Sequence, residues 1–201
     1  MGRLGFSERK RYIGIFNGRI AVRVKEHTEG AIRRVNKLQK EVWELHYDIY
    51  EGVVTNILKE VEAKFGPRLV IECDHSDVLQ VPWSSRYTKS FLACVPNLEL
   101  DAPVTFRPYR FTPDDKPDKV INGWTIMQGK SKVPEAYDRT ELPDLKQVIV
   151  KGAPVWDDTE LLDFLWREAM KVWSAKIHGT SVPAALSETL EAATDADDVP
   201  F

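Results

Sequence analysis

The 201-residue sequence has no long apolar run and very little cysteine. No apolar stretch approaches the roughly 20 residues that a helix needs to cross a bilayer, so we expect no membrane-spanning segment. Charged residues follow closely on Met1–Gly5, which leaves no apolar region for a secretory signal. Cys73 and Cys94 lie far apart with apolar neighbours, a placement typical of reduced core thiols rather than of a disulfide framework. These absences predict a cytoplasmic protein with no membrane partner.

Recognisable catalytic motifs are also missing. There is no glycine-rich phosphate loop, and three of the four histidines lie near no serine or cysteine in a nucleophile context. The stretch Cys73-Asp74-His75 is similar to part of a metal site, but no second cluster at ligand spacing accompanies it. The sequence therefore predicts a protein that is not an enzyme and that needs no cofactor or metal. A metal-dependent nuclease using Asp74, His75 and Asp77 is kept as an alternative.

What the sequence does contain is a strong asymmetry of charge. The formal net charge is only −3, and the content of 43% apolar and 29% charged residues is ordinary for one globular domain. Residues 1–40 nevertheless hold eleven lysines and arginines against three acids, whereas residues 182–201 hold five acids and no base. A basic front end beside an acidic body is typical of proteins that bind a polyanion.

The basic front end is predicted to be a hairpin followed by a loop. Two alternating runs, 12–16 and 19–24, flank Asn17-Gly18, the pair that best suits a two-residue type I′ turn. Residues 25–40 lose this alternation, so we expect a mobile or helical-turn basic loop there. The cations of this loop that are candidates for clamping phosphates are Arg33, Arg34, Lys37 and Lys40.

The middle of the chain alternates in a way typical of short strands. The predicted strands are, in order, 41–57 with a bulge at Gly52, then 68–73, 78–83, 103–111 and 123–128. A short helix, capped at Ser84-Ser85 and stopped by Pro96, lies between the third and fourth strands. This β-β-β-α-β-β order predicts a five-stranded OB-type β-barrel, a fold that commonly binds oligonucleotides. SH3-like barrels and small sandwiches share the short strands, and the helix favours the OB barrel over them.

A capped amphipathic helix is predicted after a last strand or edge segment at 146–150. Asp157 or Asp158 can accept from the free N–H groups of its first turn, and apolar residues recur at helical spacing. Beyond Gly179 the residues are small, polar or acidic, which predicts a disordered acidic tail. The predicted fold class is mainly β with appended helices (α+β). Its segments are the hairpin and basic loop 1–40, the OB domain 41–155, the helix 156–178 and the tail 179–201.

Aromatic and basic residues are interleaved in several of the predicted strands and loops. Binding of single strands without sequence preference needs cations along the phosphates and flat rings for the bases, each stacked base being worth about 1–3 kcal/mol. Alternation places Arg107, Tyr109 and Phe111 on the face opposite to Val104 and Phe106, which makes Arg107 and Tyr109 the strongest candidates. The further candidates for DNA contact are Arg110, Trp83, Arg86, Tyr87, Lys89, Trp43, Tyr47, Tyr50 and Trp124. Which of these aromatics stack on bases and which fill the core stays open.

The final residues carry the most specific signal. Asp197-Asp198-Val199-Pro200-Phe201, preceded by Asp195, sets acids next to a hydrophobic-Pro-Phe ending. This ending resembles the acidic tip of bacterial and phage single-stranded DNA-binding proteins, a family in which the tip docks replication, recombination and repair proteins. Only the last five to seven residues match closely, and the barrel is matched by strand order alone.

The resemblance implies a non-catalytic OB-fold protein that coats single-stranded DNA and recruits partner proteins. The residues that would bind those partners are Asp195, Asp197, Asp198, Val199, Pro200 and Phe201. The segment before the predicted barrel and the helix after it depart from the bacterial members and suggest a phage-type relative in a bacterial cytoplasm. The bacterial tetramer is not carried over, and a homodimer is compatible with the sequence. A recombination annealing protein is a second alternative, beside the nuclease.

Overall fold

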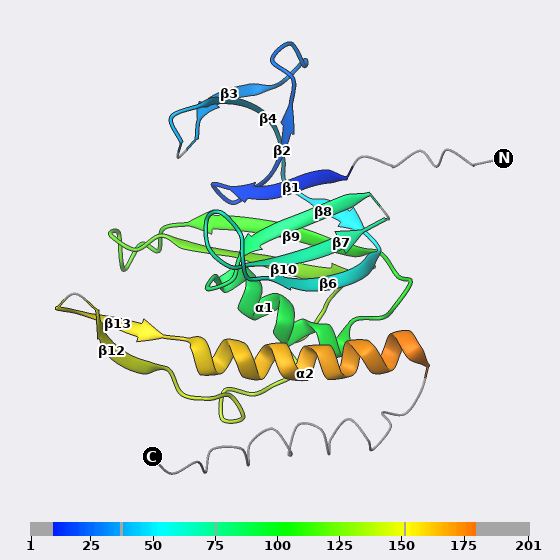
Figure 1. Cartoon of the computed structure of the whole chain (residues 1–201), viewed down its shortest axis with the longest axis vertical. Coiled ribbons are helices and arrows are strands. Elements are labelled where there is room, and N and C mark those ends of the chain that lie inside the picture. The colour runs from blue at the N-terminus through cyan, green and yellow to red at the C-terminus, as the bar shows by residue number, and fades with distance from the viewer. Residues whose placement is uncertain (1–9, 37, 75, 151, 180–201) are drawn as a thin grey trace, which may run out of the picture.

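The computed structural model describes residues 10–36, 38–74, 76–150 and 152–179. Within these ranges strands dominate, arranged in two sheets and one separate hairpin, and two α-helices pack beside the sheets (Figure 1). The predicted fold class, mainly β with appended helices, is therefore confirmed at this level. No helix in the described ranges is both long and apolar enough to cross a membrane.

The larger sheet has seven strands and contains the N-terminal hairpin. In spatial order its strands are β3 (Ile32–Val35), β4 (Glu41–Tyr47), β2 (Arg19–Val24), β1 (Arg11–Phe16), β8 (Asp77–Pro82), β7 (Arg68–Cys73) and β6 (Val54–Glu60). Neighbouring strands are antiparallel except β1 and β8, which run parallel with Tyr12 opposite Val78. The hairpin of β1 and β2 thus lies in the middle of the sheet.

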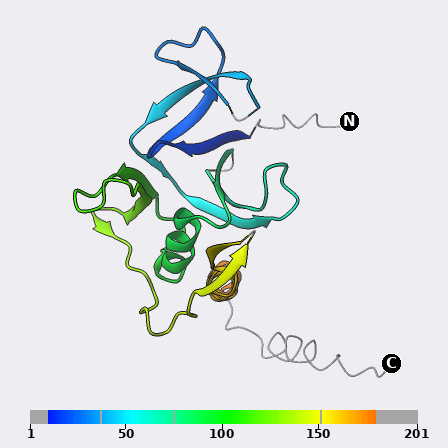
Figure 2. The same ribbon diagram turned by 90° about the vertical axis from the view of Figure 1, so that its left-hand side faces the viewer.

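A smaller sheet and the helices complete the described structure. The smaller sheet holds, in spatial order, β11 (Ser131–Lys132), β10 (Ile121–Gln128), β9 (Val104–Phe111) and β5 (Tyr50–Gly52). A hairpin of its own is formed by β12 (Lys146–Val150) and β13 (Ala153–Asp157). The helix α1 (Arg86–Cys94), followed by the 3-10 turn η1 (Val95–Asn97), contacts both sheets and the long helix α2 (Thr159–His178) (Figure 2).

The predicted closed five-stranded barrel is not formed. The predicted elements occur in the predicted order, but the stretch 41–60 is divided into β4, β5 and β6. These three strands pair with different neighbours: β4 with β2 and β3, β5 with β9, and β6 with β7. The register also shifts between Val54 and Asn56, two residues beyond the bulge predicted at Gly52. The sheets stay open because β1, rather than the last strand of the predicted barrel, pairs with the edge of β8.

The first forty residues match the prediction in the hairpin and differ in the loop. Asn17 and Gly18 have φ of 51° and 74°, the left-handed conformation that a type I′ turn requires. The predicted mobile or helical-turn loop over 25–40 instead contains strand β3, which pairs with β4. The charges of Arg33 and Arg34 hide this strand in the sequence, because each arginine forms an ion pair with a glutamate of β4.

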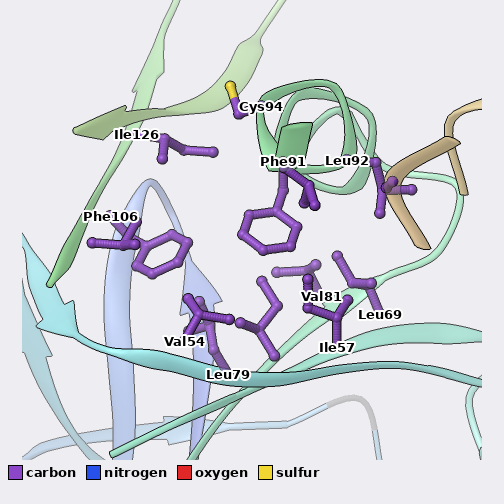
Figure 3. Close-up of a cluster of buried hydrophobic side chains, with 14 of the residues drawn as sticks. Val54, Ile57, Leu69, Leu79, Val81, Phe91, Leu92, Cys94, Phe106 and Ile126 are labelled. Atoms are coloured by element: carbon purple, nitrogen blue, oxygen red, sulfur yellow. The ribbon is translucent and has the colours of Figure 1, made fainter. Parts of the chain in front are cut away.

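The core lies between the large sheet on one side and the small sheet with α1 on the other (Figure 3). Phe91 of α1 faces Phe106 of β9 with the ring centroids 5.9 Å apart, and the ring of Trp124 lies 5.2 Å from that of Phe106. Cys73 and Cys94 are free and buried in this core, and burial raises the pKa of both thiols to about 12. The prediction of reduced core thiols is confirmed.

Both predicted helix starts are found. Ser85 is the N-cap of α1, and its Oγ accepts a hydrogen bond from the Thr88 amide at 3.2 Å. At the start of α2 the N-cap residue is Asp158, but Asp157 provides the oxygen, which accepts from the Thr159 amide at 3.0 Å. These contacts satisfy amide groups of the first turn that have no partner within the helix.

Gly18 is the point at which the hairpin turn meets β9. Its φ is 74°, and a Cβ there would lie 2.6 Å from the backbone nitrogen of Arg110. We expect Gly18→Ala to lower the free energy of unfolding by roughly 1–3 kcal/mol, measured by urea denaturation. Gly14→Ala is the matched control, since a Cβ at Gly14 would meet nothing within 4 Å. The control is expected to be as stable as the unchanged protein or more so; equal losses in both variants would contradict this account.

Candidate nucleic-acid interface

The outer face of the large sheet, opposite the core, carries a groove of about 860 Å³. Alternation along β1 builds its floor, because Ile13 and Ile15 pack toward the core while Tyr12, Gly14 and Phe16 line the outer face. The strands β2 and β8 flank β1. We call this surface the β1 groove.

The lining of the β1 groove is cationic and aromatic. Its cations are Lys10, Arg11, Arg23, Arg34 and Arg68, and its rings are Tyr12, Phe16 and Phe65. Glu44 is the one acid among its described lining residues. Of these residues the sequence prediction included only Arg34. The others were missed, although the spacing of Tyr12, Gly14 and Phe16 on one face of a predicted strand was a readable signal.

A buried carboxylate fixes an arginine over one ring of the groove. The side chain of Glu44 is only 3% exposed, and it accepts from Arg34 Nε at 2.5 Å and Nη2 at 2.6 Å. The guanidinium of Arg34 lies 4.5 Å from the centroid of the Phe16 ring, and the ring of His46 lies 5.9 Å from it. Burial by itself raises the pKa of Glu44, but the hydrogen bonds from Arg34 and His46 outweigh it and hold this pKa below its usual range. Phe16 is thereby held as a fixed flat surface.

A second buried carboxylate ties β1 to β8. Arg11 donates from Nε to Asp77 Oδ1 at 2.7 Å and from Nη2 to Oδ2, and the hydroxyl of Tyr50 donates to the same carboxylate at 3.1 Å. The hydrogen bonds from Arg11 lower the pKa of Asp77, and burial raises that of Tyr50. Tyr50, a predicted DNA-contacting residue, therefore uses its hydroxyl inside the fold.

The other three cations of the groove differ in how firmly they are held. Arg23 Nε lies 4.0 Å from Glu44, and Arg68 Nε lies 3.5 Å from Glu60. Lys10 pairs with Glu72 on the exposed surface. Arg68 is mostly buried and also donates from Nη1 to Gln80 at 2.9 Å. The side chains of Arg23 and Lys10 are more than half exposed, and exposed ion pairs contribute only about 0–1 kcal/mol, so these two cations are the ones available to a ligand.

The outer face of β9 forms a second surface, and here the predicted alternation is confirmed. Val104 and Phe106 are buried, whereas Arg107 and Phe111 are exposed and Tyr109 is half-buried. The rings of Tyr109 and Phe111 lie 5.9 Å apart. Arg110 donates to Asn17 in the hairpin turn, next to Phe16 of the β1 groove. The two surfaces therefore meet at this turn.

The remaining predicted DNA-contacting residues are spread over the fold. Trp83 and Trp124 are buried, and Trp43 and Tyr47 lie on the face of β4 opposite Glu44 and the groove. Arg86 and Tyr87 line a smaller pocket of about 330 Å³ beside β10. Three cations have other neighbours or stand exposed: Lys89 pairs with Asp158, Arg33 pairs with Glu41, and Lys40 lies exposed. Lys37 and the partner-binding residues Asp195 to Phe201 lie outside the described residues.

The candidate metal ligands are engaged in the fold. Asp74 Oδ1 accepts from the Val53 amide at 3.0 Å, and Asp77 is held by Arg11. His75 lies outside the described residues. Within the described ranges no three histidine, cysteine or acidic side chains gather in a way that could hold a metal ion.

Comparison with models of known protein families, with curated proteins and with solved structures gives no match to this chain.

Removal of Arg34 should expose the cost of burying Glu44. We expect Arg34→Ala to lower the free energy of unfolding by about 3 kcal/mol near neutral pH, because it leaves a buried carboxylate with only its longer contacts to Arg23 and His46. Without Arg34 the pKa of Glu44 rises. The loss should therefore shrink as the pH falls toward the ordinary glutamate pKa of 4.5, where protonation removes the buried charge.

Urea denaturation at several pH values measures this effect. The control is Arg33→Ala, which removes an exposed pair with Glu41 and should cost at most about 1 kcal/mol. A loss in Arg34→Ala that stays constant with pH would rule out Glu44 as its source.

Proposed function

We propose that this protein binds single-stranded DNA without sequence preference and coats it during replication, recombination or repair. The observation that carries the proposal is the β1 groove, which five cations and three rings line and in which Glu44 is the one acid among the described lining residues. Phosphates need the cations and unpaired bases need the rings. The element order of residues 41–128 supports an OB-type relationship without a closed barrel, because it matches the β-β-β-α-β-β order of OB domains when β4, β5 and β6 are counted as one interrupted strand.

Two kinds of cation divide the work in this proposal. Arg34 and Arg11 are fixed by buried carboxylates, so their task is to hold Phe16 and β1 in place. Arg23 and Lys10, whose side chains are more than half exposed, can exchange their carboxylate contacts for phosphates. The cations would contact phosphates and the rings would stack on base faces, and neither contact depends on the base sequence. This arrangement therefore favours affinity over base discrimination.

Single strands fit this surface better than duplexes do. Side chains two residues apart on one face of a strand are about 6.6 Å apart, so Tyr12 and Phe16 are separated by about 13 Å with Gly14 between them. Only unpaired bases can turn toward rings at this spacing on the floor of a groove, because the bases of a duplex are stacked and paired inside it. The outer face of β9, with Arg107, Tyr109 and Phe111, continues the proposed track beyond the hairpin turn.

The residues Asp195 to Phe201 are proposed to recruit replication, recombination or repair proteins. The support is the resemblance of Asp197-Asp198-Val199-Pro200-Phe201 to the acidic tip of bacterial and phage single-stranded DNA-binding proteins. An aromatic ring beside carboxylates suits an apolar pocket rimmed by basic groups on a partner. On this proposal the protein acts in a bacterial cytoplasm, as a phage or prophage product.

Gly14→Val tests the groove directly. A valine there has room in the structure and favours the strand, but its side chain projects between the two rings where a base would lie. We expect thermal stability to be unchanged or higher and the affinity for a fluorescent oligo-dT to fall roughly 5- to 100-fold, as for the loss of one stacked base. Fluorescence anisotropy at several salt concentrations measures it.

Ser131→Val on the exposed strand β11 is the matched control, and it should leave binding unchanged. A parallel titration with duplex DNA tests the preference for single strands. Incubation of labelled single strands with Mg²⁺ tests for nuclease activity, and mixing complementary coated strands tests for annealing. Unchanged binding by Gly14→Val, or no binding of single strands by the unchanged protein in dilute buffer, would remove the proposal.

Deletion of residues 195–201 tests the proposed partner-binding role. These residues carry three acids, so we expect the shortened protein to bind single-stranded DNA equally or more tightly because the competing anion is gone. The immobilised shortened protein should no longer retain replication proteins that the immobilised full-length protein retains. Weaker DNA binding by the shortened protein would contradict this role.

A further inference from the structure

The hairpin of β12 and β13 makes almost no use of its surface within the molecule. Among the strands of the described residues it pairs only with itself (Figure 1). Every residue of both strands is exposed except Asp157, which is half-buried. Ile149 is 71% exposed and Trp156 62%, beside the exposed Val148, Val150 and Val155. A two-stranded hairpin is marginally stable in water, and clustered apolar side chains at such a site mark an interaction surface.

The two edges of this hairpin are not equivalent. Val150 pairs with Ala153, from which two residues separate it in the chain. In a hairpin such a first pair is hydrogen-bonded, and hydrogen-bonded and non-hydrogen-bonded pairs alternate beyond it. The backbone groups of Gln147 and Ile149 therefore point away from β13 to a free edge. None of the backbone hydrogen bonds found among the described residues outside the strand ladders uses them.

Proline closes the opposite edge. Pro154 is the residue paired with Ile149, at a position whose N–H would point outward from β13. Because proline has no N–H, a further strand cannot bond there in the regular way. Proteins commonly blunt exposed edges in this manner to avoid uncontrolled pairing. Only β13 has this protection, so the open edge of β12 is available for pairing.

We propose that β12 pairs antiparallel with β12 of a second copy of this chain, about a two-fold axis at Val148. In this register Gln147 lies opposite Ile149 of the partner subunit, and each of the two equivalent pairs exchanges two hydrogen bonds. Lys146 lies opposite Val150 of the partner subunit, so no like charges face each other. The two hairpins become one four-stranded sheet. This inference does not depend on DNA binding.

The sequence of β12 favours a second copy over a different partner. Its outward groups at 147 and 149 are symmetric about Val148, so the edge is complementary to itself. Growth stops at the dimer, because the outer edges of the four-stranded sheet are the β13 strands with Pro154. A contact of one strand pair buries less than the roughly 1,000 Å² of a stable interface, so the dimer should be weak and concentration-dependent.

A disulfide at the axis tests the proposal in the full-length chain without DNA. A non-hydrogen-bonded antiparallel pair has Cα atoms about 4.5 Å apart, within the range that a disulfide spans. Val148→Cys should therefore give a covalent dimer under mild oxidation, seen on a non-reducing gel. Both natural thiols, Cys73 and Cys94, are buried and should not react.

Val155→Cys is the matched control, because it lies on β13 opposite Val148 and is also exposed. Its yield of covalent dimer should be no higher than that produced by random collision of exposed thiols. Ile149→Pro, added to Val148→Cys, removes an outward N–H while leaving the hairpin's own pairs intact, and it should abolish cross-linking. A monomeric Val148→Cys, equal cross-linking of the control, or no effect of the proline would overturn the proposal. Binding of a foreign peptide to a β12 edge that does not self-pair would also overturn it.

Discussion

The parallel pairing of β1 with β8 is the constraint on which the rest of the architecture depends. It places the N-terminal hairpin in the middle of the large sheet, and the ion pair between Arg11 and Asp77 fixes its register at the first pair. With β1 on the edge of β8, β9 and β10 remain in a second sheet that joins the stretch 41–60 only through β5. The outer face of the large sheet is consequently centred on β1.

The chemistry of that face follows from how strongly each charge is already satisfied. Breaking a buried ion pair costs about 3–5 kcal/mol, whereas an exposed pair is worth at most about 1 kcal/mol. Arg34 and Arg11 are therefore parts of the scaffold, whereas the mostly exposed Arg23 makes only a 4.0 Å contact with Glu44 and, on the proposed function, can meet the ligand. A cluster of basic residues counted from sequence does not distinguish these roles; the burial of the acid beside each one does.

Local structure was predictable to the extent that it depends on neighbouring residues. The Asn17-Gly18 turn, the Ser85 cap and the alternation along β9 all follow from short-range rules, and the structure has them. The pairing of β1 with β8 joins residues more than sixty positions apart and leaves no mark in the local pattern. The barrel prediction failed at this long-range contact.

The same limit explains why most of the groove was missed. The alternation of polar and apolar residues along β4 would put Glu44 on the exposed side, yet it is the most buried residue of that strand, because Arg34 from β3 neutralises it. A prediction from the alternation of polar and apolar residues assumes that polar residues are exposed. A carboxylate with a dedicated arginine breaks that assumption, and the partner is known only once β3 is seen to be a strand.

On the proposed function, the tight contact of the hairpin turn with β9 has a consequence for the length of single-stranded DNA that the protein binds. Gly18 leaves no space between the turn and the backbone of Tyr109 and Arg110, so the groove and the β9 face meet at a closely packed junction. A DNA strand bound in the β1 groove would meet a β9 face that is already oriented, so binding there would cost no further conformational entropy of the protein. The footprint should then have a sharp minimum size, set by the distance across this junction rather than by either face alone.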